Sequence, residues 1–231
     1  MVHISSKWKI DVQFIEHGDI YFFYKPKKSV RETRGIQDVA RFFIVLAPEG
    51  PAPHRYIVMG NKTMPRTEDS EKTTWGFVQI IGGRGFEIDT KQKGLVRKGA
   101  SRPAGEGIYT IIKHRDHTHL LYSLELPEKT GEVQNAFNIQ QEANYIMLER
   151  SVEHVPRSPD LPFSNFSPVT LQDLNRRGTE VLFIGVGSDI GRLGIRAEKD
   201  PETIKTADIF STLKLSSDRH PIESLISGNW E

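Results

Sequence analysis

The chain has 231 residues, of which 37% are hydrophobic and 26% charged, a composition typical of a globular protein rather than of a disordered chain. It contains no cysteine, which excludes disulfides, thiolate metal sites and a cysteine nucleophile. The net charge of +1 conceals an uneven distribution, because residues 1–100 carry 17 Lys and Arg against 11 Asp and Glu, whereas residues 101–231 carry 14 against 19.

No segment predicts a membrane partner or export. The longest apolar runs, Phe42–Ala47 and Val181–Val186, are six residues each, whereas a membrane-spanning helix needs about 20. The first residues, MVHISSKWK, lack the continuous apolar run of a signal peptide. We therefore expect a soluble protein of the cytoplasm.

Short segments rich in aromatic and branched residues dominate the first two thirds of the chain and predict strands. They are Asp19–Tyr24, Arg41–Ala47, Arg55–Met59, Trp75–Ile81, Ile108–Lys113, His119–Leu126 and Tyr145–Glu149. The run Arg41–Ala47 is apolar after its first residue, which predicts a strand buried on both faces. The polar residues 115–118 separate two apolar segments and predict a hairpin.

Few helical patterns lie between these segments, so the connections of a parallel sheet are missing. We therefore predict a mostly β protein of the α+β class, with antiparallel sheets arranged as a sandwich or a partly open barrel. A few short helices are expected, mainly in the C-terminal third. Residues 131–138 predict a further helix, because Val133 and Phe137 are spaced to share one face.

A change of composition suggests a division of the chain. Four of the 13 prolines lie in Val155–Pro168, which predicts a loop or linker. We expect a β-rich domain over residues 1–154 and a small α+β C-terminal subdomain over residues 169–231. One compact unit is the alternative.

The C-terminal part predicts its own elements. Residues 167–178 read as a short helix with Pro168 near its first position and Gly178 past its end. A buried strand follows at 180–186, and helical turns are expected near 207–213 and 221–226. Trp230 is expected to pack against the body of the protein.

Three histidines and an aspartate lie within residues 114–119. His117 and His119 are two residues apart and would share one face of a strand, close enough to bind one metal ion. A complete site would need a third ligand from His114, Asp116 or the distant residues His154 and His220. The alternative interpretation is a polar hairpin tip, where charged residues are expected.

Other catalytic motifs are incomplete. The glycines of residues 185–191 follow an apolar strand, but the helix of a dinucleotide-binding loop does not follow them. His114-Arg115-Asp116 lacks the remaining motifs of a protein kinase, and no Gly-x-Ser-x-Gly or His-Glu-x-x-His pattern occurs. The sequence thus indicates no cofactor and favours a protein that is not an enzyme.

Two basic segments, residues 25–34 and 91–102, each carry five Lys and Arg. If they met on one face, each phosphate they bound would add salt-dependent affinity for a polyanion. Aromatic residues of the preceding strand, Tyr21, Phe23 or Tyr24, could stack on bases. Solvated loops are the alternative. The candidate contacts for a polyanion are Lys27, Lys28, Arg31, Arg97, Lys98 and Arg102.

Several segments resemble an uncharacterised family of bacterial and fungal proteins. They are DIYFFYKPK, DVARFFIVLAPEG, WGFVQII, GEVQNAFNIQQEANYIMLE and ADIFSTLKLSSDRHPIESLISGNWE, spread over residues 19–231. The resemblance implies a self-contained unit. Because that family has no established reaction or ligand, it implies no functional residue.

Together these patterns favour a protein of unknown function that is a non-enzymatic intracellular binding or interaction protein. Its partner would be another protein or a polyanion. Two alternatives stay open, namely a polyanion or nucleic-acid binder that uses segments 25–34 and 91–102, and a metal-assisted enzyme that uses residues 114–119.

Overall fold

The computed structural model describes residues 2–4, 12–69, 71–82, 100–150, 166–189, 195–197, 207–213, 215 and 220–230. Its strands are β1 (Val2–Ile4), β2 (Val12–Pro26), β3 (Val39–Pro48), β4 (His54–Met59), β5 (Thr73–Gly82), β6 (Arg102–His114), β7 (His117–Leu126), β8 (Glu142–Arg150), β9 (Phe166–Pro168), β10 (Glu180–Gly187) and β11 (Ile195–Ala197). Its helices are α1 (Glu132–Phe137), α2 (Leu171–Leu174), α3 (Ile209–Thr212) and α4 (Glu223–Ser227), and one 3-10 turn spans Ile36–Asp38.

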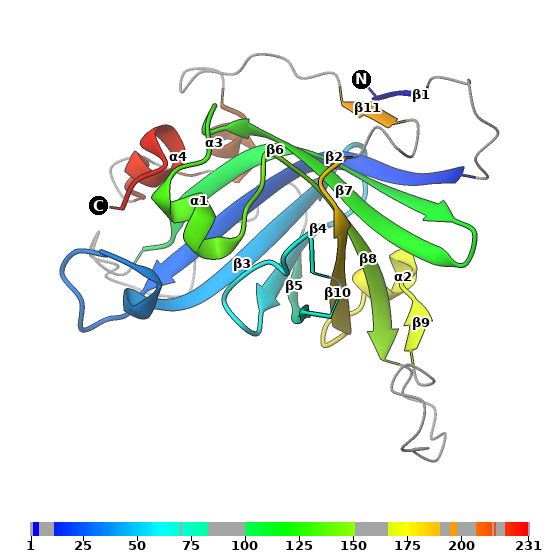
Figure 1. Cartoon of the computed structure of the whole chain (residues 1–231), viewed down its shortest axis with the longest axis horizontal. Helices are drawn as coiled ribbons and strands as arrows, with labels where there is room; N and C mark the ends of the chain where they lie inside the picture. Colours follow the sequence, from blue (N-terminus) through cyan, green and yellow to red (C-terminus); the bar gives the residue numbers. More distant parts are fainter. Residues whose placement is uncertain are drawn as a thin grey trace.

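Eight antiparallel strands form a closed barrel (Figure 1). They follow the order β10, β5, β4, β3, β2, β6, β7 and β8, and the pairing of β8 with β10 closes the ring. The short strand β9 adds to β8, and β1 pairs with β11 outside the ring. The predicted mostly β, antiparallel class is confirmed, as is the hairpin of β6 and β7. Of the two predicted arrangements, the barrel is the one observed, and it is closed rather than partly open.

The interior of the barrel is filled by alternate side chains of its strands. In β2, Ile20, Phe22 and Tyr24 point inward and belong to the main hydrophobic core. Their neighbours Tyr21 and Phe23 point outward, yet they are also fully buried. Period-two alternation therefore puts apolar side chains on both faces of this strand.

The C-terminal helices explain why the outward face is buried. Ile209 of α3 and Leu225 of α4 pack with Phe23 of β2 and Phe43 of β3 in a second hydrophobic cluster. The rings of Phe23 and Phe43 stack with centroids 5.2 Å apart. The prediction that Arg41–Ala47 is buried on both faces is thus confirmed for the residues after Arg41, because the barrel interior takes one face and this cluster takes the other.

One end of the barrel is covered by α1 and the C-terminal segment, at the left of Figure 1. Phe137 of α1 stacks on Phe42 with centroids 4.6 Å apart, and Trp230 contacts both Phe137 and Tyr24 edge-on. The buried Gln134 side chain joins the two segments, since its amide nitrogen donates to the backbone oxygens of Ala104 and Ser224. The predicted packing of Trp230 is confirmed. We call this the α1 end.

The opposite end, the α2 end, is covered by α2 and the segment before it. Thr118 of β7 donates from its hydroxyl to the backbone oxygen of Val169 at 2.8 Å. The helix begins later than predicted, because Thr170 and Asp173 cap each other through side chain and backbone. Pro168 belongs to β9 and not to the first helical turn. Within the described part of the chain, no helix is long and apolar enough to cross a membrane.

The C-terminal part of the chain contributes directly to the barrel. Strand β10, from the segment predicted as a subdomain, lies between β5 and β8. The described strands on either side of 155–168 therefore belong to one sheet, and the predicted division into domains stays a prediction. Only residues 166–168 of the predicted linker are described, so its nature stays a prediction.

Candidate functional site

The described ends of the strands next to the two basic segments lie at the same end of the barrel. Strand β2 ends at Pro26, β6 begins at Arg102, and the two strands are antiparallel with Tyr24 paired to Arg102. The end of one strand and the start of the other therefore lie side by side at the α1 end. Arg97 and Lys98 lie outside the described residues, so their positions relative to residues 25–34 stay a prediction.

The loop after β2 presents exposed cations. Lys27, Lys28 and Arg31 are exposed and make no ion pair within the described residues, whereas Arg34 pairs with Glu32 at 3.0 Å. Backbone hydrogen bonds hold this loop in shape: the amide of Lys27 donates to the oxygen of Asp38 at 2.8 Å and that of Val30 donates to Lys27 at 3.1 Å. The loop is seen at the lower left of Figure 1.

Two more cations extend this surface along the barrel wall. Lys25 of β2 and Arg41 of β3 are directly paired in the ladder and both point outward, because their neighbours Tyr24 and Phe42 point inward. The ladder thus places two cations side by side on the outer wall of the barrel. We name as the basic end the residues Lys25, Lys27, Lys28, Arg31, Arg34 and Arg41.

Other predicted polyanion contacts lie inside the protein. Arg102 is 3% exposed and its guanidinium donates to the backbone oxygen of Ala100 at 2.6 Å, so its charge is turned away from the surface. Tyr21, Phe23 and Tyr24 are all fully buried, and the hydroxyl of Tyr24 is hydrogen-bonded to Ser224 at 2.9 Å. The prediction that these three aromatic rings stack on bases is wrong, since the barrel core and the α3–α4 cluster enclose them.

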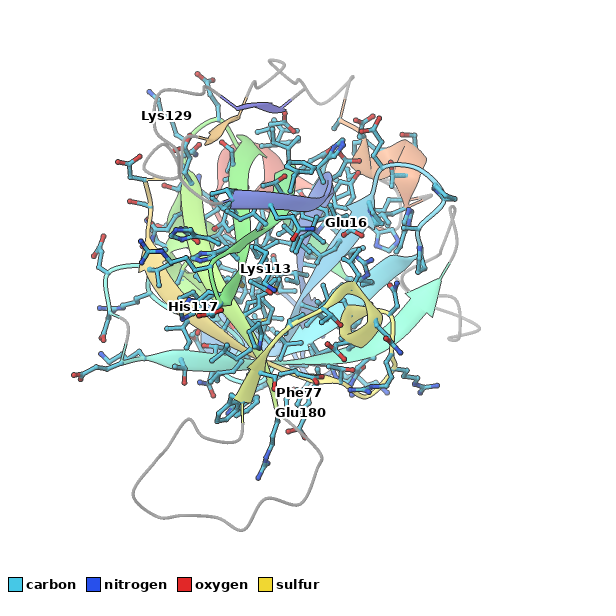
Figure 2. All side chains as sticks on the ribbon, turned by 90° about the vertical axis from the view of Figure 1, so that its right-hand side faces the viewer. Glu16, Phe77, Lys113, His117, Lys129 and Glu180 are labelled. Atoms are coloured by element: carbon cyan, nitrogen blue, oxygen red, sulfur yellow. The ribbon has the colours of Figure 1, made fainter. Side chains whose placement is uncertain are left out.

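The histidine cluster lies at the tip of the β6–β7 hairpin, at the α2 end. His114 is paired with His117 across the hairpin, and His117 and His119 share the outer face of β7, as predicted. The ring of His119 is 5.9 Å from that of His114 and 6.3 Å from that of His117, centroid to centroid. His117 is labelled in Figure 2, which views the molecule from this end.

The other predicted metal ligands are not brought to the cluster. His220 lies at the opposite end of β6, where its ring contacts the backbone oxygen of Ser101 at 3.0 Å, and His154 is outside the described residues. Asp116 is exposed in the hairpin turn. Among the described side chains, no group of three or more His, Asp or Glu stands ready to hold a metal ion. Metal binding by His117 and His119 thus stays a prediction.

Sequence reasoning missed a buried polar network at the α2 end of the barrel interior. Arg55, fully buried, forms two hydrogen bonds with the carboxylate of Glu16, one of them 2.7 Å long. Its Nε donates to Asn175 at 2.8 Å, and the hydroxyl of Tyr109 donates to Glu16 at 2.6 Å. Burial, followed by the Glu16 charge, raises the pKa of Tyr109 well above its usual value.

This network satisfies its own groups. Each carboxylate oxygen of Glu16 accepts at least one hydrogen bond, and the charge of Arg55 is balanced within the barrel, so the arrangement acts as a polar cross-link between β2, β4, β6 and the end of α2. One feature of the sequence pointed to this buried network. Arg55 occupies the same face of β4 as the core residues Ile57 and Met59, and a charge at an inward position needs a buried partner.

Comparisons with known proteins add nothing to this geometry: no protein-family model, no curated protein and no solved structure matches the chain. The resemblance to an uncharacterised bacterial and fungal family accordingly stays a prediction.

Proposed function

We propose that the protein binds polyanions, and that the basic end makes the contacts with phosphate or sulfate groups. The observation that carries this proposal is the group of exposed cations at one end of the barrel: Lys27, Lys28 and Arg31 make no ion pair within the described residues, and Arg41 is exposed on the adjoining strand β3. A surface on which exposed cations gather attracts a ligand that carries many negative charges.

The chemistry of this surface favours recognition of charge density rather than of base sequence. The aromatic rings of the adjoining strand are buried and unavailable for stacking. Lys and Arg side chains would instead bind backbone anions and release their counterions. Five of the six cations are exposed, so we expect the logarithm of the affinity for single-stranded DNA to fall with the logarithm of salt concentration with a slope of about −3.5.

The test is a salt titration of binding by the full chain. Fluorescence anisotropy would measure the affinity for a labelled single-stranded 15-mer and for heparin between about 50 and 200 mM NaCl, the range over which phosphate contacts weaken strongly. The variant Lys28→Glu/Arg31→Glu is expected to lose at least tenfold in affinity at low salt. Its salt slope should be less steep by about 1.4, since two contacts are removed.

The matched control reverses two exposed cations at the α2 end. Lys113 and Arg115 are exposed and make no ion pair within the described residues, and the view in Figure 2 places Lys113 at that end. Lys113→Glu/Arg115→Glu changes the net charge by the same amount and is expected to alter affinity less than twofold. An affinity that does not respond to salt, or equal losses in the two variants, would contradict the proposal.

A further inference from the structure

A second feature, at the opposite end of the barrel, has the chemistry of a metal ligand. His119 is 6% exposed, and its Nδ1 lies 2.9 Å from the side-chain oxygen of Asn144 on β8. Because an amide oxygen only accepts hydrogen bonds, Nδ1 carries the proton of the ring. The lone pair of the neutral ring therefore resides on Nε2, which has no hydrogen-bond partner among the described residues.

This arrangement matches the way proteins prepare an imidazole to bind a metal. A ligating histidine usually donates its other ring N–H to an oxygen that fixes the tautomer and the orientation of the ring. Asn144 has that position relative to His119.

The second ligand is exposed and free to rotate. His117 lies two residues along the same face of β7 and makes no hydrogen bond or ion pair within the described part of the chain. Two imidazoles that coordinate one ion through bonds of about 2.1 Å have centroids roughly 5 to 5.5 Å apart. The ring centroids of His117 and His119 are 6.3 Å apart. A rotation of the His117 side chain to another rotamer would bring the rings to the distance needed for coordination, without movement of the strand.

We propose that His117 and His119 bind one borderline transition-metal ion, Zn²⁺ or Cu²⁺, with water in the remaining coordination positions. Imidazole nitrogen suits both ions. Asn144 is a positioning residue that presents Nε2 of His119. The site is a surface site with two protein ligands, and it stands on residues separate from the basic end.

Titration with each metal salt alone tests the site. Isothermal titration calorimetry of the full chain at pH 7.5 is expected to show one ion per chain. We expect His117→Ala to weaken binding at least tenfold, and Asn144→Ala to weaken it by about tenfold, a typical cost of losing the group that orients a ligand. The electron paramagnetic resonance spectrum of the Cu²⁺ complex should show coupling to two imidazole nitrogens, and one in the His117→Ala variant.

The control is His17→Ala, which removes a partly exposed imidazole that pairs with Glu49 on another part of the barrel. It should bind metal as the unaltered chain does. Since His117 is exposed, its replacement leaves the fold intact, and circular dichroism would verify this. The proposal is overturned if the chain shows no saturable binding, if His117→Ala retains its affinity within twofold, or if His17→Ala causes an equal loss.

Discussion

Asp19 shows how a single carboxyl can make the stability of this protein depend on pH. It lies on the outer side of β2, where burial raises its pKa to about 6, with Asp208 and Glu49 adding to the increase. The Tyr21 hydroxyl, which donates to Asp19 at 3.3 Å, and His17 oppose the increase. Since the pKa is higher in the folded chain than the ordinary value of 3.8, folding favours the protonated carboxyl.

The stability contributed by protonation is fully present below about pH 4 and is lost as the pH rises through 6. We therefore expect Asp19→Asn to raise the free energy of unfolding at pH 8 by about 2 kcal/mol, less than the full shift would give because the carboxyl is partly solvated. At pH 3.5 the substitution should have little effect. Urea denaturation at pH 3.5, 6 and 8 measures this, and an equal effect at all three values would contradict the assignment.

Two buried tyrosines of the barrel interior differ in what their hydroxyls bind. The hydroxyl of Tyr109 donates to the buried carboxylate of Glu16, whereas that of Tyr145 has no hydrogen bond of normal geometry within the described part of the chain and faces the hydroxyl of Tyr122. We expect Tyr109→Phe to cost about 1.5–3 kcal/mol of unfolding free energy, the range for hydrogen bonds to charged groups. Tyr145→Phe should change it by less than about 1 kcal/mol.

Chemical denaturation of the two variants gives a direct comparison, because both remove the same atom from the same kind of environment. Both side chains are at most 2% exposed and both belong to the main core, so loss of packing is equal in the two cases. If Tyr145→Phe lowered the free energy of unfolding more than Tyr109→Phe does, the stability of the Glu16–Arg55 network would not depend on the Tyr109 hydroxyl.

At the scale of elements, the sequence predicted strands well where both faces were apolar. Residues 41–47 of β3 form such a run, and the element is a strand. Its partner β2 is 15 residues long, whereas only residues 19–24 were predicted. The missing part contains Gln13, Glu16 and His17, and an irregularity in the ladder at Phe14–Glu16 shifts the alternation there. Local patterns did not predict this part of the strand, because Gln13 and His17 are at least partly exposed and Glu16 is paired inside the barrel with Arg55, which is distant in the sequence.

The start of α2 was missed for a different reason. The predicted position of Pro168 in the first turn rests on the preference of proline for the first position of a helix. In this chain the reciprocal cap between Thr170 and Asp173 determines where the helix begins. Thr170 and Asp173 stand at the spacing of a capping box, and the structure uses both. This signal was present in the sequence and would have placed the helix correctly.

At the scale of the whole molecule, closure of the barrel could not be read from the chain. Closure depends on the pairing of β10 with both β5 and β8. A local sequence pattern does not predict which distant strand a buried segment pairs with. The same limit applies to the candidate sites. The antiparallel pairing of β2 and β6 places Tyr24 opposite Arg102 at one end, but whether either side chain faces outward depends on the register between the two strands.

The closed barrel places the basic end and the histidine pair far apart, which leads to a final prediction about their independence. Strand β6 runs from one end to the other over 13 residues, roughly 40 Å at about 3.3 Å per residue. Charges are screened within about 8 Å at physiological ionic strength, and the interior between the two ends is packed with buried side chains. We expect saturating Zn²⁺ to change the affinity for single-stranded DNA by less than twofold.

Because Zn²⁺ also binds DNA directly, the anisotropy measurement needs the variant His117→Ala/His119→Ala as its control. Any effect of the metal that the variant shares comes from the DNA and not from the protein site. A change greater than about fivefold in the unaltered chain alone would mean that the hairpin tip takes part in polyanion binding. That outcome would place the contact surface along the β6–β7 side of the barrel instead of at the basic end.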